Sequence, residues 1–380
     1  MTRLGPTDRA ALLVWAASRA GLAWLLVVVA WSTGLALGAP AVGPGQLLQW
    51  DAVHYLAVAR DGYDQPPDGS RLDAFFPGLP LLLRGLHAVG VPWVWTGPVV
   101  SLVAGAVAVT ALARLAEADG PPGAGPRAVL LLVLAPSAVF LAAGYTEALF
   151  LALALPAWLA ARRGAWAAAG LLTAGACSVR VTGLFLLAAL AVRYLQQRRG
   201  GAGAGPPGRW SWAWLLLGLL PVLGFGAQRW ASTGDALAWL HAQQHGWGRT
   251  PTWPWDAWAR TWHAAFHEPA QPAYALLGFR LELVALVVGV ALTGWLVRNR
   301  RWPEAVFVGL QVAVLATSSY YLSVPRATLL WWPLWAALAA WTLRSRAGPG
   351  GEARLAWLLA AMVPLSVALT VGFATSRWAG

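Results

Sequence analysis

The recurrence of apolar runs about as long as a membrane-crossing helix constrains this sequence more than any other feature. About 20 apolar residues in a helix cover the hydrocarbon core of a bilayer. The chain is 58% hydrophobic and 11% charged, which is unlike a soluble domain of 380 residues. Runs such as 22–31 and 281–297 lack the alternation of a membrane β-barrel. We therefore predict an all-α, polytopic integral membrane protein.

Hydropathy predicts about eleven transmembrane helices, arranged as a single domain over residues 1–380. The apolar stretch from Ala10 is longer than the core of a usual signal peptide, so we expect it to be a retained span. The predicted spans are 11–33, 94–113, 128–144, 147–161, 165–179, 181–197, 211–229, 273–297, 303–320, 327–343 and 355–374.

The charge distribution predicts which side of the membrane each loop occupies. All 27 basic residues are arginine, and the net charge is +12. Because every turn on the predicted inner side carries arginine, the positive-inside rule places the N-terminus in the cytoplasm. The positive charge therefore reflects topology, and we expect no nucleic-acid partner. The lysine-free, Ala-, Gly- and Pro-rich composition favours a bacterial source and its cytoplasmic membrane.

Two long segments then lie outside: the first loop, 38–93, and a Trp-rich loop, 230–272. The first loop contains an acid-rich turn and the apolar run 79–91, which carries Arg84 and His87. We interpret 79–91 as an interfacial or re-entrant helix, with a full span as the alternative. Amphipathic helices are therefore expected in this loop.

Asp51 opens the most informative segment of the first outer loop. On a helix, Asp51, His54 and Tyr55 occupy positions i, i+3 and i+4 and share one face. An outward carboxylate near the membrane surface has the chemistry of a general base for an acceptor hydroxyl. The alternative is an ordinary solvated acid on an amphipathic helix.

Two arginines are predicted at the outer ends of spans, at the depth of a lipid phosphate. Arg180 lies between two short apolar helices, and Arg326 follows Pro325. The guanidinium fork suits bidentate phosphate contacts, and a charge at membrane depth is by default functional. Snorkelling, or pairing with Glu147, is the alternative. Glu147 in turn either begins a helix capped by Thr146 or orients the substrate or Arg180.

The Trp-rich loop offers rings for sugar stacking, although interfacial tryptophans are common without any ligand. Its histidine pairs, 241/245 and 263/267, have metal-compatible spacing but no carboxylate inside either pair. We therefore expect no cofactor and assign no metal ligand, leaving a divalent-metal requirement open. No nucleotide-binding motif appears, so the energy for any reaction comes from a membrane-delivered substrate or a gradient.

An ordered set of short motifs resembles the PIG-V family, the GPI mannosyltransferase II-like proteins of the GT-C glycosyltransferase superfamily. The sequence departs from the family pattern at Gly78-Leu79 and at Val181-Thr182. The matching pieces are Trp50-Asp51-x-x-His54-Tyr55, Gly62-Tyr63, Ala74-Phe75-Phe76-Pro77 with Pro80-Leu81-Leu82, Pro136-Ser137, Tyr145-Thr146-Glu147-x-x-Phe150, Arg180-Val181-Thr182-Gly183 and Pro325-Arg326.

The resemblance implies a GT-C-type fold and a polyprenyl-phosphate sugar donor, here polyprenyl-phosphate mannose. Transfer to an extracytoplasmic glycolipid or glycan acceptor would invert the anomeric carbon and give an α-mannoside. On this reading Asp51 is the catalytic base, and Arg180 and Arg326 bind the donor phosphate. The residues expected to line the substrate pocket are Trp50, His54, Tyr55, Asp73, Phe76, Tyr145 and Glu147.

Two other functions are compatible with the sequence: a flippase or transporter of lipid-linked sugars, and a non-catalytic subunit of a glycosylation complex. A transporter predicts ionisable residues within helix centres and an internal repeat. Every reading has membrane lipids as partners and places the site on the extracytoplasmic face.

Overall fold

The computed structural model describes residues 4–37, 43–64, 72–200, 208–268, 271–344 and 350–378. Within these ranges the chain is helical and contains no β-strand; Pro251 and Ser318 form an isolated antiparallel bridge. The prediction of an all-α protein is confirmed.

The chain folds into two compact units that alternate along the sequence. The first unit comprises Met1–Ala52, Val94–Ala152 and Pro325–Gly380, and the second comprises Val53–Trp93 and Leu153–Val324. Whether the whole chain is a single domain, as the sequence predicts, stays a prediction.

The helices of the first unit are α1 (Pro6–Leu37), η1 (Pro44–Leu47), nearly all of α5 (Trp93–Asp119), α6 (Ala124–Val133), η2 (Ala138–Leu141), α16 (Trp332–Leu343) and α17 (Gly350–Ala374). Those of the second unit are α4 (Gly78–Ala88), α8 (Trp166–Val179), α9 (Gly183–Arg198), η3 (Ser211–Gly218), α10 (Leu219–Thr233), α11 (Ala238–Trp247), α12 (Pro254–Phe266), α13 (Ala273–Arg298) and α14 (Trp302–Ala316). Three more pass from one unit into the other: α2 (Asp51–Asp61), α7 (Glu147–Arg162) and α15 (Val324–Thr328).

Five helical stretches among the described residues are long and apolar enough to cross a membrane. They match five of the predicted spans and confirm a polytopic membrane protein, while the span count and the sidedness stay predictions. The five stretches are Pro6–Gly34, Trp93–Asp119, Ser211–Thr233, Ala273–Arg298 and Gly350–Ala374.

The structure corrects the extent of the predicted span 128–144. Helix α6 begins at Ala124 and ends at Val133, and the chain continues through a turn into the short helix η2. Pro136 accounts for the break, because a proline disfavours helical backbone in the residue before it and removes a backbone donor. The apolar run is therefore divided into two short helices.

Residues 79–88 of the run 79–91 lie in α4 (Gly78–Ala88), a helix of 11 residues. At about 1.5 Å per residue this helix covers roughly half of a bilayer core. Its length fits the interfacial or re-entrant interpretation and not the full span. Leu79 and Leu83 face the interior, whereas Leu81 and Leu82 are exposed.

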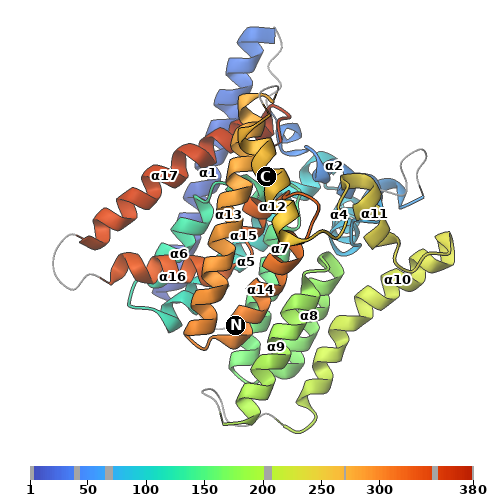
Figure 1. Cartoon of the computed structure of the whole chain (residues 1–380), viewed down its shortest axis with the longest axis vertical. Helices are drawn as coiled ribbons and strands as arrows, with labels where there is room; N and C mark the ends of the chain where they lie inside the picture. The colour runs from blue at the N-terminus through green and yellow to red at the C-terminus, as the bar shows by residue number, and fades with distance from the viewer. Residues whose placement is uncertain are drawn as a thin grey trace. The chain divides into compact units, whose positions relative to one another are not determined.

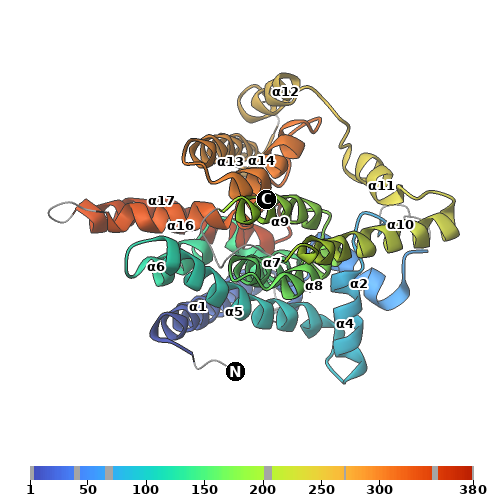
Figure 2. The same cartoon turned by 90° about the horizontal axis from the view of Figure 1, so that it is seen from below.

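In the first unit, α6 packs between α1 and α16, as Figure 2 also shows. Arg114 of α5 and Asp8 of α1 form an ion pair with Nε 2.8 Å from Oδ1. Farther along the same two helices, the Trp15 indole donates a hydrogen bond to the Leu102 carbonyl. Polar contacts at two levels therefore fix the register of α1 against α5.

In the second unit, α8 packs against η3 and α9, and α9 packs against α14, which lies beside α13 (Figure 1). The turn from α8 into α9 is very tight: a Cβ atom at Gly183 would lie 2.5 Å from the Cα atom of Cys177. The glycine of the arginine–glycine motif is therefore required by the close approach of the backbone.

Gly78, where the sequence departs from the family pattern, also lies at a close contact. A Cβ atom there would lie 2.6 Å from Ser178 Oγ and 2.7 Å from the Ser178 carbonyl oxygen. Glycine thus lets the start of α4 approach the end of α8, the helix that leads into Arg180.

The two glycines of α4 give a matched test of this contact. Gly78→Ala is expected to destabilise the protein by about 1–3 kcal/mol, because backbone atoms of Ser178 must move. Gly85→Ala is the control, since nothing lies within 4 Å of its Cβ position, and it is expected to be neutral or to stabilise by up to about 1 kcal/mol. Thermal unfolding in detergent measures both; equal midpoints would contradict the close packing.

Candidate active site

The candidate base, Asp51, is the first residue of α2 and follows a strained turn. Trp50 has φ = 53°, in the left-handed region that residues other than glycine rarely adopt. Such strain persists only when the surroundings hold it in place, and it often marks functional sites. The turn therefore needs an external support.

Tyr145, which belongs to a later motif of the family-like set, supplies that support. Its hydroxyl donates to the Gln49 carbonyl and accepts from the Asp51 amide, each at 3.1 Å. The phenol thus bridges the residues on either side of Trp50. The ring is 1% exposed, so Tyr145 fixes the start of α2 from within the interior. Burial and the nearby Asp51 carboxylate raise the pKa of Tyr145 well above its usual value, which keeps the phenol neutral.

Arg326 lies between two carboxylates. One of its terminal guanidinium nitrogens is 2.7 Å from Asp51 Oδ2, and its Nε is 3.3 Å from Glu147 Oε1. The exposed fraction of the side chain is 14% for Asp51, 12% for Arg326 and 1% for Glu147. Charges buried to this degree need partners, because an uncompensated ion in an apolar interior is very costly. The three groups therefore depend on one another.

Aromatic rings enclose the guanidinium. The Arg326 carbon Cζ lies 5.5 Å from the centre of the Phe140 ring and 5.4 Å from that of Tyr145, distances typical of cation–π contacts. Phe373 of α17 packs edge-on against both rings. Burial alone would lower the pKa of Arg326, but Asp51, Glu147 and Tyr145 raise it above its usual value. Arg326 is therefore a permanent cation.

The structure thus brings four of the sequence-predicted residues together within the first unit: Asp51, Tyr145, Glu147 and Arg326. A fifth, Trp50, lies at the edge of the group, 41% exposed, with its ring 5.5 Å from that of Trp378. Ser376 donates a hydrogen bond to the Gln49 side chain. The residues after α17 therefore contact the turn that carries the acid.

His54, Tyr55 and Phe76 belong to the second unit. The rings of His54 and Tyr55 both contact Phe75, at 5.2 and 4.8 Å between centroids. Phe76 packs instead against Phe225, in a buried apolar cluster. Phe75 thus contacts two rings of the predicted face of α2. Phe76 packs in the apolar cluster, and its place in a substrate pocket stays a prediction.

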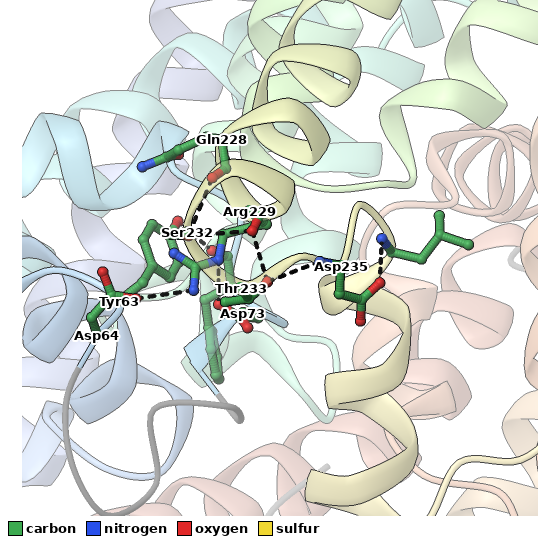
Figure 3. Close-up of polar contacts among 10 residues, drawn as sticks. Tyr63, Asp64, Asp73, Gln228, Arg229, Ser232, Thr233 and Asp235 are labelled. Atoms are coloured by element: carbon green, nitrogen blue, oxygen red, sulfur yellow. Dashed lines mark hydrogen bonds and ion pairs between the residues drawn. The ribbon is translucent and has the colours of Figure 1, made fainter.

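Asp73 is buried against Arg229 of α10. The Arg229 Nε is 2.8 Å from Asp73 Oδ1, and a terminal nitrogen is 3.1 Å from Asp64 Oδ1 (Figure 3). Burial raises the pKa of Asp73, and the Arg229 charge opposes that shift. The sequence analysis did not assign a role to Arg229, although a charge at the end of an apolar span is a usable signal.

Arg180 also lies in the second unit, at the C-terminal end of α8, where the backbone is extended. It precedes the turn that Gly183 makes tight. Its proposed phosphate contact, and its place relative to Asp51, stay predictions.

Glu282 was not singled out from the sequence, although it is an acid within a predicted span. The side chain is buried in α13 and accepts hydrogen bonds from the amides of Ser323 (2.7 Å) and Val324 (2.8 Å). A carboxylate at the first amides of a helix is favourable. Glu282 therefore caps α15, the short helix that carries Arg326.

In the Trp-rich loop, Trp258, Trp262, His263 and His267 of the segment around α12 line a shallow surface hollow together with Ala259. The exposed rings of Trp253 and Trp255 stack nearly parallel at 5.0 Å. The Nδ1 atom of His263 lies 3.5 Å from Glu268 Oε2, and that of His241 lies 2.6 Å from Asp235 Oδ2. No group of three His, Cys, Asp or Glu residues suited to hold a metal occurs among the described ranges.

The chain is a polytopic α-helical membrane protein with a buried acid–arginine–acid cluster at the start of its first loop helix. Residues 42–198 match the family model described as mannosyltransferase (PIG-V), so the family resemblance drawn from the sequence is confirmed. The matched segment contains Asp51, Glu147 and Arg180, whereas Arg229 and Arg326 lie beyond it.

Curated relatives are likewise named as mannosyltransferases. The chain is 38% identical over 151 residues to GPI alpha-1,6-mannosyltransferase 2 of Rattus norvegicus and 37% identical over 153 residues to that of Homo sapiens. Each alignment covers 37% of this chain and 30% of the relative's length. The alignment with this chain thus spans less than a third of the length of each of these mannosyltransferases.

Removing the Tyr145 hydroxyl tests whether it supports the strained turn. Tyr145→Phe leaves the part-buried Gln49 carbonyl and Asp51 amide without that partner, so we expect a loss of about 1–3 kcal/mol in stability. Hydrogen exchange at the start of α2 should become faster. Tyr274→Phe, at a side chain 44% exposed, is the control and should leave both measurements unchanged. Unaltered exchange around Asp51 in the Tyr145 variant would rule out the bridge.

Proposed function

We propose that this protein is an integral membrane mannosyltransferase. It takes mannose from polyprenyl-phosphate mannose and transfers it to an extracytoplasmic glycolipid or glycan acceptor, with inversion to an α-mannoside. The Asp51–Arg326–Glu147 cluster in a membrane protein that matches a mannosyltransferase family carries the proposal. The proposed location is the bacterial cytoplasmic membrane, with the site on its outer face.

The proposed reaction assigns the proton transfer to Asp51. As the acceptor oxygen attacks the anomeric carbon, Asp51 takes the proton of the hydroxyl group, and the bond from that carbon to the phosphate oxygen breaks. The lipid phosphate leaves with the electron pair. Arg326 contacts Asp51 through Oδ2, so it holds the carboxylate in one orientation, and Oδ1 takes no part in that contact.

Electrostatics favours the departure of the phosphate. A fixed cation at the leaving group stabilises developing negative charge without reorganisation in the transition state. Arg326 is a permanent cation beside the candidate base, and Arg180 is the second proposed phosphate ligand. Because Glu147 shares Arg326 with Asp51, it keeps the guanidinium in place as the charge at the base changes.

The direct test supplies radiolabelled polyprenyl-phosphate mannose and candidate glycolipid acceptors to the purified protein. Asp51→Asn keeps the shape of the side chain but removes the base, and we expect kcat to fall about 10²–10⁴-fold. Asp256→Asn, on the exposed surface of α12, is the control and should retain the wild-type rate.

Each alternative predicts a different outcome of this assay. Full activity of Asp51→Asn would refute the base assignment. Movement of the lipid-linked sugar across vesicles without a glycosidic product would favour a flippase or transporter. Transfer that requires an added partner would favour a subunit of a glycosylation complex.

The phosphate assignment has its own test. Arg180→Gln should raise KM for the lipid-linked donor about 10- to 100-fold, because hydrogen bonds to charged groups contribute about 1.5–3 kcal/mol. KM for the acceptor should change little. Arg298→Gln, at the last residue of α13, is the control for the loss of one arginine elsewhere in the protein. An unchanged donor KM in Arg180→Gln would exclude phosphate binding by this residue.

A further inference from the structure

Arg229 is a buried charge near the end of a membrane-length helical stretch, Ser211–Thr233, and lies outside the family-matched segment. The side chain is 3% exposed. An arginine at such a depth is costly unless it is paired, and by default it marks a functional position.

The guanidinium of Arg229 contacts three residues of the first outer loop (Figure 3). Its guanidinium forms ion pairs with Asp73 at 2.8 Å and Asp64 at 3.1 Å, and its Cζ lies 5.1 Å from the centre of the Tyr63 ring. These partners stand on both sides of residues 65–71. One arginine therefore joins two segments of the loop that are separated in sequence.

The joined segments determine where Phe75 lies. The Tyr63 hydroxyl donates to the Phe75 carbonyl at 2.8 Å, and Asp73 precedes Phe75 by two residues. The Phe75 ring contacts both His54 and Tyr55 of α2. A chain of direct contacts thus runs from Arg229 to the aromatic face of α2.

The stability of the fold does not by itself explain the buried ion pair of Arg229 with Asp73. Val58, Tyr63, Leu72, Phe76 and Phe225 form a buried apolar cluster, and Arg229 lies over the ring of one of its members, Tyr63. Replacing a buried ion pair by apolar side chains of similar volume is often neutral or stabilising. The directional fork of arginine does what an apolar contact cannot, because it fixes two carboxylates and a ring in one geometry.

We propose that Arg229 is a positioning residue, which sets the conformation of the first outer loop so that Phe75 holds the His54–Tyr55 face of α2. For its effect on catalysis this inference rests on the proposed mannosyl transfer. For its effect on the loop it rests on the contacts alone.

The experiment compares three variants of the full-length protein in detergent. Arg229→Met with Asp73→Leu replaces the pair by apolar side chains and is expected to unfold within a few degrees of the wild type. Arg229→Lys keeps the charge but loses the fork. Arg280→Met is the matched control, since Arg280 also lies over a ring, that of Phe266, near the end of a membrane-length helix.

Hydrogen exchange and steady-state kinetics are measured on each variant. In the double variant, exchange over 53–61 and 72–78 should become at least about tenfold faster, and kcat should fall about 10- to 100-fold with little change in the donor KM. Arg229→Lys should fall between the double variant and the wild type in both measurements. Arg280→Met should match the wild type.

The outcomes separate the two proposals. Wild-type exchange and kcat in the double variant would overturn the positioning role, and so would a uniform loss of protection throughout the protein. If the wild type transfers no mannose, the proposed function fails, and exchange over 53–61 alone decides the role of Arg229. If the double variant does not fold, Arg229→Lys decides, and wild-type behaviour there overturns the proposal.

Discussion

The ion pair of Asp51 with Arg326 joins residues 275 positions apart, and the arrangement of the candidate site depends on it. Two carboxylates and a guanidinium are buried together, and each of these charges would be strongly destabilising in an apolar interior without the others. Supporting contacts surround this pair: Tyr145 bridges the turn before Asp51, and Glu282 caps the helix that carries Arg326. The site is thus a set of charges, each held by a separate part of the backbone.

A buried arginine paired with two carboxylates also occurs in the second unit. Arg229 is buried and paired with Asp64 and Asp73, as Arg326 is buried between Asp51 and Glu147. Both arginines follow or end apolar helical segments, and both lie beyond the residues that match the PIG-V model. The matched segment contains Asp51, Glu147 and Arg180, and the later part of the chain supplies Arg229 and Arg326. A match over residues 42–198 therefore leaves out two of the arginines discussed.

Sequence patterns predicted most helices well, because a membrane-length apolar run has few alternatives to a helix. The exceptions are 128–144, which is interrupted after Val133, and 327–343, which is interrupted between Thr328 and Trp332. In both runs hydropathy was weighted above a proline close to the break, Pro136 and Pro333. Among site residues, Asp51, Tyr145, Glu147 and Arg326 were singled out and are adjacent in the structure. Phe75 was noted only as part of a motif, and Arg229 and Glu282 were missed although each is a charge within a predicted span. The residues that these three contact have no local signature in the sequence.

The sequence by itself determined the class of fold, the helical segments and the ionisable residues available for a site. Those follow from local physics, namely hydropathy, charge placement and turn chemistry. The tertiary structure decided the partners: Arg326 lies between Asp51 and Glu147, Asp73 is buried against Arg229, and Tyr145 supports a strained Trp50. Pairing over such distances depends on how helices pack, because burial makes each charge require a partner but does not specify which one.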